Sequence, residues 1–568
     1  MTQHPVLAQA ASDDPLIADG IAPRSPSVVM RLSRMGSFHA SRLSFMRILL
    51  RRMKAEGWVI TRLLWEVDAK GVGRAVYTAR GPERFYSLVA FAHDLPDHMR
   101  SDRVIATAWD ATFTLHDGIP SAEDLARLEA NVPLQEAGRV SEKELCLARA
   151  NRSVRLWDHV VESLAAGQQP DATKVAEVGY LMRTTAVYGS AKFGAADREV
   201  IVNRAECLAP FQMEMLTVWL IRAFVMDLVE HMARIKGGTK AVTLDPKLRR
   251  AFGIGNSTGL GMAPFLVNHP VLLNNWIAAR EWALARVRSV AAPSETERER
   301  FLALLPRAAK NAALWRSDHP AQIEKLKALR ADLAALQAEA AKGLAPAYPW
   351  DALWRFGETA LTEEGQEALA SLLIEVHPER VDGLSDCMAA DEAQAFPIDG
   401  AGTVKRLRSD IEAHYSWALN VDWAKREAQA RVWYVSQEKL EPRLGERWEE
   451  DVAAWEQPLQ PGRDVAALHA ALQDEEGSVA AFLMAHPEHR HIVRRVQIAT
   501  RYPYAEIRDN TISADVQPID LLRAKLSFFG AGHFDPRSDR WVRINMFRGA
   551  PFPGELAEAD VEGWAWPE

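Results

Sequence analysis

Hydrophobic and polar positions divide the chain into strand-like ends and a helical middle. Between residues 58 and 92, apolar and β-branched runs alternate with turn residues, which predicts a small antiparallel sheet. Residues 541–547 alternate apolar and polar side chains and predict a strand near the C-terminus. From residue 121 to about 500, helix-like spacing prevails. The expected fold class is therefore α+β and predominantly α-helical, with short antiparallel strands near both chain ends around a large helical middle.

Three segments carry the clearest helix patterns. Residues 33–54 place apolar side chains at three- and four-residue spacing among arginines, which predicts a basic amphipathic helix. Residues 216–229 are almost wholly apolar, but Arg222 and Asp227 interrupt a run that is shorter than the ~20 residues of a membrane span, so a buried helix is expected. Leucines recur at the same spacing within 326–336, which predicts a helix that lays a leucine stripe on a partner.

At 568 residues, the chain exceeds the size that one hydrophobic core supports, so a multidomain protein is expected. Changes of pattern predict a flexible N-terminal tail (1–28), an α/β region with the small antiparallel sheet (29–120), a helical core region (121–345), a helical region rich in tryptophan (346–500) and a C-terminal strand-containing region (501–568). The tryptophans of the fourth region are expected to pack between helices, because neighbouring acidic residues disfavour stacking on nucleic-acid bases.

Composition and charge exclude several classes of protein. The chain is 48% hydrophobic and 25% charged, which is ordinary for a globular protein. Its net charge of -8 provides no general attraction to nucleic acid or to an anionic membrane. Cys146, Cys207 and Cys387 lie far apart in the sequence, so neither a disulfide framework nor a cysteine zinc site is expected. The first 28 residues lack the apolar segment of a secretory signal, and a cytoplasmic location is expected.

The segment Gly253–Phe265 combines glycines with small polar side chains and then a proline. This composition predicts a loop that runs into a helix and that brings backbone N–H groups close to an anion. It lacks the lysine of a phosphate-binding P-loop, because Met262 and Ala263 follow the last glycine. The substrate-binding residues predicted here are Gly255, Asn256, Ser257, Thr258, Gly259 and Gly261. A purely structural glycine turn is the alternative.

A second stretch, residues 182–194, concentrates cations and hydroxyl groups. Arg183 is suited to hold a carboxylate or phosphate with two hydrogen bonds, and Lys192 adds a point charge. Tyr188 is the candidate for proton transfer, so these three residues form the predicted catalytic set. The alternative is a helix end that presents its cations to water. The prediction depends on the convergence of this stretch with the glycine segment.

Both stretches contain a local resemblance to the short-chain dehydrogenases. Gly255, Gly259 and Gly261 resemble the G-x-x-x-G-x-G dinucleotide loop of that family, and Tyr188 with Lys192 resembles its Y-x-x-x-K pair. The resemblance implies a nicotinamide cofactor, with the lysine assisting ionisation of the tyrosine. In this chain the pair precedes the loop, which is the reverse of the family's order, and the match covers about a dozen residues.

Two histidine clusters contain metal-ligand residue types. They are His93-Asp94-x-x-Asp97-His98 and His486-x-x-His489-x-His491, and neither completes a known zinc or iron signature. Prolines at 96 and 487 also disturb helical presentation of these side chains. No metal site is therefore predicted.

The function expected from these features is that of a cytoplasmic enzyme acting on a small anionic metabolite that carries a carboxylate or phosphate. The reaction type and the cofactor stay unassigned. One alternative is a non-enzymatic helical scaffold or regulatory protein, which the leucine stripe and the aromatic helices favour. A third is a nicotinamide-dependent oxidoreductase. The expected partner is a small-molecule anionic substrate, with no nucleic acid and no membrane, and a homo-oligomer is compatible with the sequence.

Overall fold

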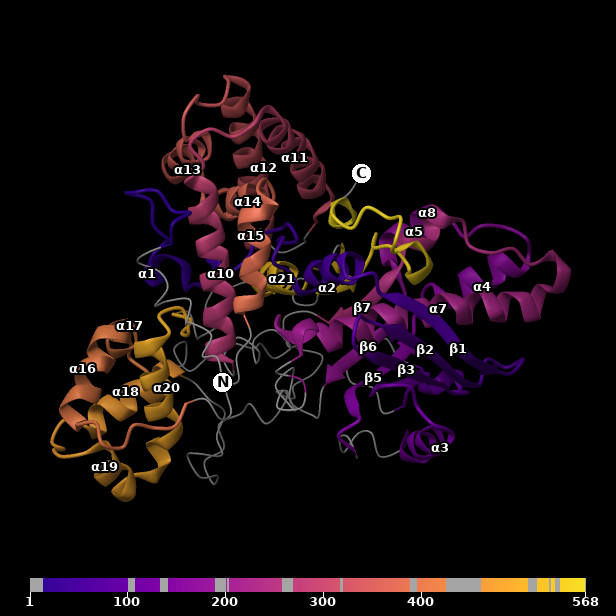
Figure 1. Ribbon diagram of the computed structural model, residues 1–568, viewed down its shortest axis with the longest axis horizontal. Helices are drawn as coiled ribbons and strands as arrows, with labels where there is room; N and C mark the ends of the chain where they lie inside the picture. Colours follow the sequence, from indigo (N-terminus) through magenta and orange to yellow (C-terminus); the bar gives the residue numbers. More distant parts are fainter. Residues whose placement is uncertain are drawn as a thin grey trace. The chain divides into compact units, whose positions relative to one another are not determined.

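A computed structural model (Figure 1) describes residues 14–100, 108–132, 141–188, 201, 204–257, 269–316, 320–388, 396–424, 461–508, 518–530, 533–536 and 542–566. The chain forms two compact units, each assembled from separate segments. The helical unit contains Met1–Phe38, Gly259–Ala312 and Arg316–Lys525, and the sheet unit contains His39–Thr258, Ala313–Trp315 and Leu526–Glu568. More residues lie in helices than in strands, so the expected mixed and mostly helical fold class is confirmed.

The sheet unit is built on a nine-stranded sheet with the order β1-β2-β3-β4-β5-β6-β7-β9-β8. The strands are β1 (Val59–Val67), β2 (Gly73–Arg80), β3 (Phe85–Ala92), β4 (Ala111–Asp117), β5 (Glu144–Arg152), β6 (Tyr180–Tyr188), β7 (Gly253–Ser257), β8 (His533–Pro536) and β9 (Val542–Met546). Neighbouring strands are antiparallel except for β6 and β7, which are parallel. Strands from both ends of the chain therefore share one sheet.

Helices cover both faces of this sheet. On one face, Phe224 of α7 (Gln212–Gly237) contacts the rings of Trp65, Tyr77 and Phe113. On the other, α3 (Ala122–Asn131) contributes Leu128 to a cluster with valines and a phenylalanine of β2 and β3. Successive side chains of each strand point to opposite faces, so the strands pack against helices on both sides of the sheet. The apolar segment 216–229 lies within α7, which confirms the predicted buried helix.

The remaining helices of this unit are α2 (Phe45–Ala55), α4 (Trp157–Ala165), α5 (Ala172–Val178) and α8 (Pro246–Ala251). The amphipathic helix expected over 33–54 is thus shorter, since α2 begins only after Ser44, which has an extended backbone. Residues 32–34 form a separate short helical turn. Three strands, β5, β6 and β7, fall in the region that was expected to be helical throughout. The described side chains of β5 and β6 are mostly buried on both faces, so a polar-apolar alternation was not visible in the sequence, and the glycines of β7 resemble those of a turn.

The helical unit contains α10 (Pro270–Arg288), most of α11 (Glu295–Leu314), and α12 (Pro320–Ala341), α13 (Pro349–Ala360) and α14 (Glu363–Ile374). The predicted leucine stripe lies on α12, and its four leucines are at most 2% exposed. Because α12 contacts α14, the stripe packs inside its own unit. None of the described helices combines the length and the apolar character that a membrane crossing requires.

A second core lies within the helical unit. It is formed by α16 (Val404–His414), α17 (Ser416–Leu419), α18 (Pro461–Ala471), α19 (Val479–Ala485) and α20 (Arg490–Arg501). Tyr415 is fully buried there, and Trp417 and Trp423 pack against the same core, as expected for aromatic residues between helices. Residues 425–460, which carry most of the other aromatic residues of this stretch, lie outside the described residues.

Candidate ligand-binding site at the paired strands β6 and β7

The first part of the glycine segment is a strand and not a loop. Gly253–Ser257 form β7, hydrogen-bonded on both edges to β6 and β9. Glycine is required here for close packing: a Cβ on Gly255 would lie 2.8 Å from the ring of Tyr180, and one on Gly253 would lie 2.5 Å from the carbonyl oxygen of Met546. The sequence expectation of a loop at 253–257 was therefore wrong, because glycines that serve close approach were read as turn residues.

The two stretches predicted to converge lie on neighbouring strands. In the parallel pairing of β6 with β7, Arg183 is opposite Gly255 and Tyr180 is opposite Gly253. A side-chain hydrogen bond joins the two strands: the Asn256 amide Nδ2 donates to the Thr184 hydroxyl at 3.1 Å. Two parallel strands run to their carboxyl ends side by side, and open α/β sheets commonly bind ligands outside such ends.

The predicted residues occupy opposite faces of the sheet. Adjacent residues of a strand point to opposite faces, so Arg183 and Thr184 diverge. Asn256 shares the face of Thr184, because their side chains are hydrogen-bonded. Gly255, which is opposite Arg183, lies on the other face, where the ring of Tyr180 covers it. Arg183 and Asn256 therefore do not line one pocket, and the predicted set separates into two groups.

The face that carries Arg183 is buried and polar. The Arg183 and Asn151 side chains are each 1% exposed, and their strands pair at these positions. Asn151 has a structural role, since its side-chain oxygen accepts from the backbone N–H of Asp110 at 2.9 Å and its amide donates to the Ala108 carbonyl at 3.1 Å. The Tyr180 hydroxyl accepts a hydrogen bond from Arg155 at 3.4 Å. Arg183 on β6 and Arg155, which bonds Tyr180 of β6, thus bring two guanidinium groups to this strand.

The other predicted residues are placed only in part. The backbone of Tyr188 is in β6, opposite Leu147 of β5, and that of Ser257 is in β7, opposite Arg543 of β9. Lys192, Thr258, Gly259 and Gly261 lie outside the described residues.

The described arrangement differs from the one that the dehydrogenase resemblance implies. In a dinucleotide-binding fold, the first glycine opens a loop after a parallel strand, whereas Gly255 lies within β7 with its backbone paired on both sides. The sheet around it is antiparallel except at this one pair of strands.

Sequence reasoning missed one polar side chain next to β7, that of Asn545 on β9. Asn545 is opposite Gly255 and 1% exposed, and its amide Nδ2 donates to the Val178 carbonyl at 3.0 Å. Its position depends on the pairing of β9 with β7, two strands far apart in the sequence. The alternating pattern that predicted β9 was visible, but its neighbour in the sheet was not.

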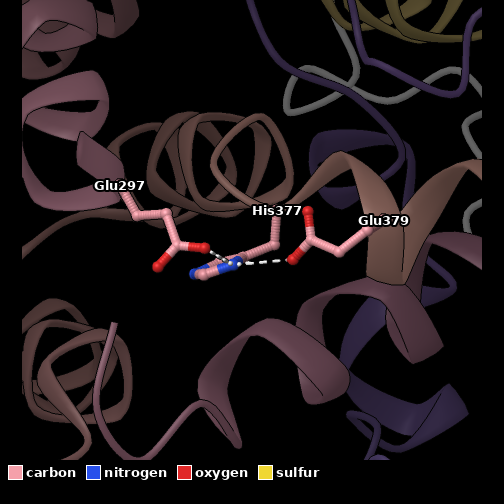
Figure 2. A group of neighbouring side chains, drawn as sticks. All are labelled: Glu297, His377 and Glu379. Atoms are coloured by element: carbon pink, nitrogen blue, oxygen red, sulfur yellow. Dashed lines mark hydrogen bonds and ion pairs between the residues drawn. The ribbon is translucent and has the colours of Figure 1, made fainter. Parts of the chain in front are cut away.

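A different group, in the helical unit, gathers residue types that bind metals (Figure 2). The side chains of Glu297, His377 and Glu379 offer ligand atoms that all lie within 4.8 Å of one another, and the figure shows both carboxylates beside the imidazole. Nδ1 of His377 is 3.0 Å from Glu379 and 3.2 Å from Glu297. Neither histidine cluster predicted from sequence forms such a group among the described residues.

The hydrogen bond on the far side of the His377 ring determines its chemistry. Trp350 is fully buried and donates its indole N–H to Nε2 of His377 at 2.9 Å. An indole nitrogen only donates, so Nε2 must accept and the proton of the neutral ring must be on Nδ1. Nδ1–H then donates to the carboxylates and presents no lone pair to a cation. We therefore interpret this group as a structural hydrogen-bonded chain.

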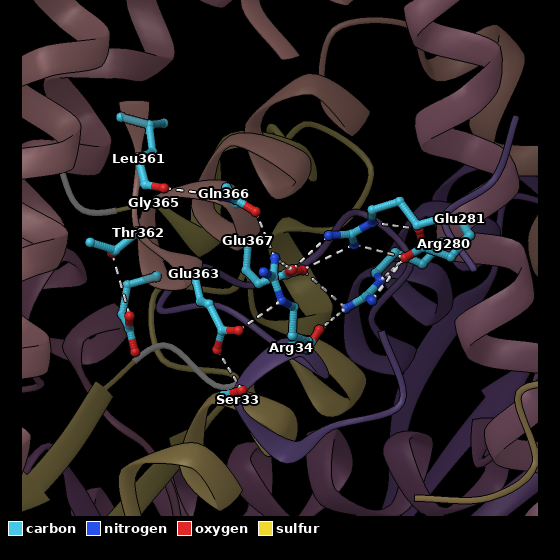
Figure 3. Close-up of polar contacts among 12 residues, drawn as sticks. Ser33, Arg34, Arg280, Glu281, Leu361, Thr362, Glu363, Gly365, Gln366 and Glu367 are labelled. Carbon is cyan, nitrogen blue, oxygen red and sulfur yellow. Dashed lines mark hydrogen bonds and ion pairs between the residues drawn. The ribbon is translucent and has the colours of Figure 1, made fainter. Parts of the chain in front are cut away.

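A buried ionic network also lies in the helical unit, and Figure 3 shows its members Arg280, Glu281 and Glu367. The Arg24 guanidinium binds Glu281 at 2.8 and 2.9 Å and Glu367 at 2.6 and 3.1 Å, and these three side chains are at most 7% exposed. Arg280 donates to Glu281 at 2.9 Å and to the Arg34 carbonyl at 2.9 Å. Burial alone would raise the pKa of Glu281, but Arg24 and Arg280 outweigh burial and lower it to about 2. The network anchors the N-terminal segment to α10 and α14.

Comparison with known proteins identifies no relative: no family model, no curated protein and no solved structure matches the chain.

Proposed function

We propose that the protein is a cytoplasmic enzyme that acts on a small anionic metabolite bound beside β6 and β7. The observation that supports this proposal is the parallel pairing that places buried Arg183 opposite Gly255. A guanidinium group presents a fork of N–H donors that matches a carboxylate or a phosphate, and a site shielded from water strengthens that interaction. The ligand is proposed to lie on the Arg183 face of the sheet.

The roles of the neighbouring residues follow from this placement. Arg183 would hold the anionic group, and Tyr188, further along the same strand, is the proposed proton-transfer residue. Lys192 would contribute a second positive charge. Thr184 and Asn256 bind each other on the opposite face, so their proposed contribution is to fix the two strands and not to contact the ligand. Gly255 allows the Tyr180 ring to pack against β7 on this same face.

Native mass spectrometry of the freshly purified protein is the first test, because it reveals a retained small anion by mass. Affinity and turnover of the identified ligand are then measured for Arg183→Gln and Tyr188→Phe. Arg183→Gln removes the charge from the anion contact, so affinity is expected to fall by roughly 10- to 100-fold. Tyr188→Phe is expected to lower turnover more than affinity, because it removes a proton donor while leaving the ring in place.

Lys174→Ala is the matched control, since Lys174 is an exposed cation on α5 of the same unit. It is expected to leave affinity and turnover at the wild-type level. Thermal unfolding and far-UV circular dichroism establish that each variant is folded. Unchanged affinity and turnover in both folded site variants would contradict the proposed function.

The scaffold alternative has lost one of the two observations that favoured it. The leucine stripe on α12 is buried within the helical unit, so its leucines are not available to a separate partner.

A further inference from the structure

Residues 547–566, called the strap here, follow β9 directly and lie against α7 of the sheet unit. Trp219 of α7 donates its indole N–H to the Pro551 carbonyl at 2.9 Å. Arg222, one turn further along α7, donates to the Ala550 carbonyl at 2.8 Å. Both donors are fully buried. This end of the strap is therefore held through its backbone carbonyl groups.

Arg222 is a buried cation that depends on the strap for part of its coordination. Its guanidinium also donates to the carbonyls of Phe252 at 2.6 Å and Arg250 at 3.2 Å, and its Cζ lies 3.8 Å from the centre of the Phe552 ring. Burial lowers the pKa of Arg222, because it opposes the charged form. A buried charge that loses hydrogen-bond acceptors is costly. Removal of the strap would take away the Ala550 carbonyl and the Phe552 ring, so Arg222 favours the closed strap.

The other end of the strap is held by a stacked pair of rings, those of His39 and Trp566. The ring centroids are 5.0 Å apart with an interplanar angle of 25°, and the residues are 1% and 5% exposed. Burial lowers the pKa of His39 from its ordinary value of 6.5 to about 4. A cation is attracted to an indole face, which favours a charged His39, but burial outweighs this attraction. This end of the strap therefore fits a neutral His39 and opposes a charged one.

The charged side chains of the two segments that meet at this end already include a shared carboxylate. Arg42 and Arg47 bind Glu562 of the strap, at 2.7 and 3.8 Å. The other charged side chains of α2 and the strap that the structure describes are Arg51, Arg52, Lys54, Arg548, Glu555, Glu558 and Asp560. A proton on His39 thus adds positive charge where two arginines share one carboxylate.

We propose that the strap is a releasable element whose closed position requires a neutral His39, so that acid opens it. A histidine whose folded pKa is depressed contributes stability that is present above pH 6.5 and is lost as the pH falls toward 4. Opening would free β9, which continues into the strap and pairs with β7. The device would in this way reach the strand that carries Gly255, but it stands independently of the proposed function.

Hydrogen exchange of the full-length protein at pH 8 and pH 5, corrected for the intrinsic pH dependence of exchange, tests the proposal. Protection of peptides within residues 549–566 is expected to fall by roughly 10- to 30-fold at pH 5, as the depressed pKa of His39 requires. Peptides of β2 (Gly73–Arg80) are expected to keep their protection. Unchanged protection of the strap would overturn the proposal. An equal loss in the strap and in β2 would also overturn it, because the whole unit would then be unfolding.

His39→Phe is the decisive variant, since it keeps an aromatic ring on Trp566 but accepts no proton. The variant is expected to protect the strap equally at pH 8 and pH 5. His98→Phe is the matched control, because His98 is exposed in the same unit, and it should retain the wild-type response to pH. Far-UV circular dichroism establishes that each variant is folded, and the wild-type comparison requires no variant. A strap that still opens at pH 5 in folded His39→Phe would contradict the role of His39.

Discussion

The side-chain amide of Asn256 donates to the hydroxyl of Thr184 at 3.1 Å, across the parallel strands β7 and β6. This contact assigns the two residues to one face of the sheet, and it thereby assigns their neighbours Gly255 and Arg183 to the other. The residues that the sequence predicted to line one pocket therefore form two groups, one on each face of the sheet. The proposed site uses the Arg183 face, and the Asn256–Thr184 pair holds the strands together.

A double-mutant cycle tests the coupling of Asn256 and Thr184. Asn256→Ala and Thr184→Val are each expected to lower the free energy of unfolding by about 0.5–1.5 kcal/mol, because each removes this part-buried hydrogen bond. The double variant is expected to lose less than the sum, by about 0.5–1.5 kcal/mol. Urea denaturation measures all four proteins.

The control cycle pairs Asn256→Ala with Thr78→Val. Thr78 is 7% exposed and lies on β2, where its hydroxyl bonds Ser87 of β3, far along the sheet from β7. This cycle should be additive. Strict additivity in the Asn256–Thr184 cycle as well would contradict the contact.

Gly255→Ala is expected to destabilise the sheet unit by about 1–3 kcal/mol, because the added methyl group would lie 2.8 Å from the Tyr180 ring. Gly554→Ala is the matched control in the same unit, since its Cβ would meet nothing within 4 Å. Thermal unfolding should show a clear decrease in Tm for the first variant and almost none for the second. Equal Tm values for the two variants would show that Gly255 is not needed for close packing.

Arg24→Met is expected to destabilise the protein by about 3–5 kcal/mol, because it leaves Glu281 and Glu367 buried without one of their cations. Arg406→Met, which breaks an exposed pair with Asp410 on α16, should change stability by less than about 0.5 kcal/mol. Chemical denaturation of both variants provides the comparison. Similar losses would mean that the Arg24 network is no more important than a surface ion pair.

The same network predicts a dependence of stability on pH. The pKa of Glu281 is about 2 in the folded protein, below its ordinary value of 4.5. An acid with a depressed folded pKa contributes stability above its unfolded pKa and loses that contribution as the pH falls toward the folded value. The free energy of unfolding should therefore fall between about pH 4.5 and pH 2, and Glu281→Gln should show a shallower slope over this window. An identical slope in the variant would rule out a contribution from this carboxylate.

His377 is expected to be the Nδ1–H tautomer at neutral pH, because Nε2 accepts from Trp350. Nitrogen-15 NMR of the imidazole distinguishes a protonated Nδ1 from a protonated Nε2. Addition of Zn²⁺ should leave these signals in place, and Trp350→Phe should free Nε2. A Zn²⁺-dependent shift of Nδ1 in the wild-type protein would instead identify a metal site.

The sequence predicted those elements whose patterns are local. β-Branched and aromatic runs separated by turn residues predicted β1 to β3, alternation predicted β9, and a long apolar run predicted α7. Strands β5 and β6 were hidden because burial on both faces removes alternation, and β7 was hidden because its glycines imitate a turn. The sequence led us to expect that the stretches around Arg183 and Gly255 lie side by side. Which of their side chains share a face of the sheet depends on the strand register, which the sequence did not reveal. Asn545 could not be anticipated, since its role requires knowing which strand pairs with β7.

Hydrogen exchange measured with and without the ligand identified by native mass spectrometry tests the central claim most directly. Ligand binding is expected to slow exchange in peptides covering Tyr180–Tyr188 and Gly253–Ser257, and to leave Pro320–Ala341 in the helical unit unchanged. Protection confined to the helical unit, with β6 and β7 exchanging as before, would contradict an anion site at these strands.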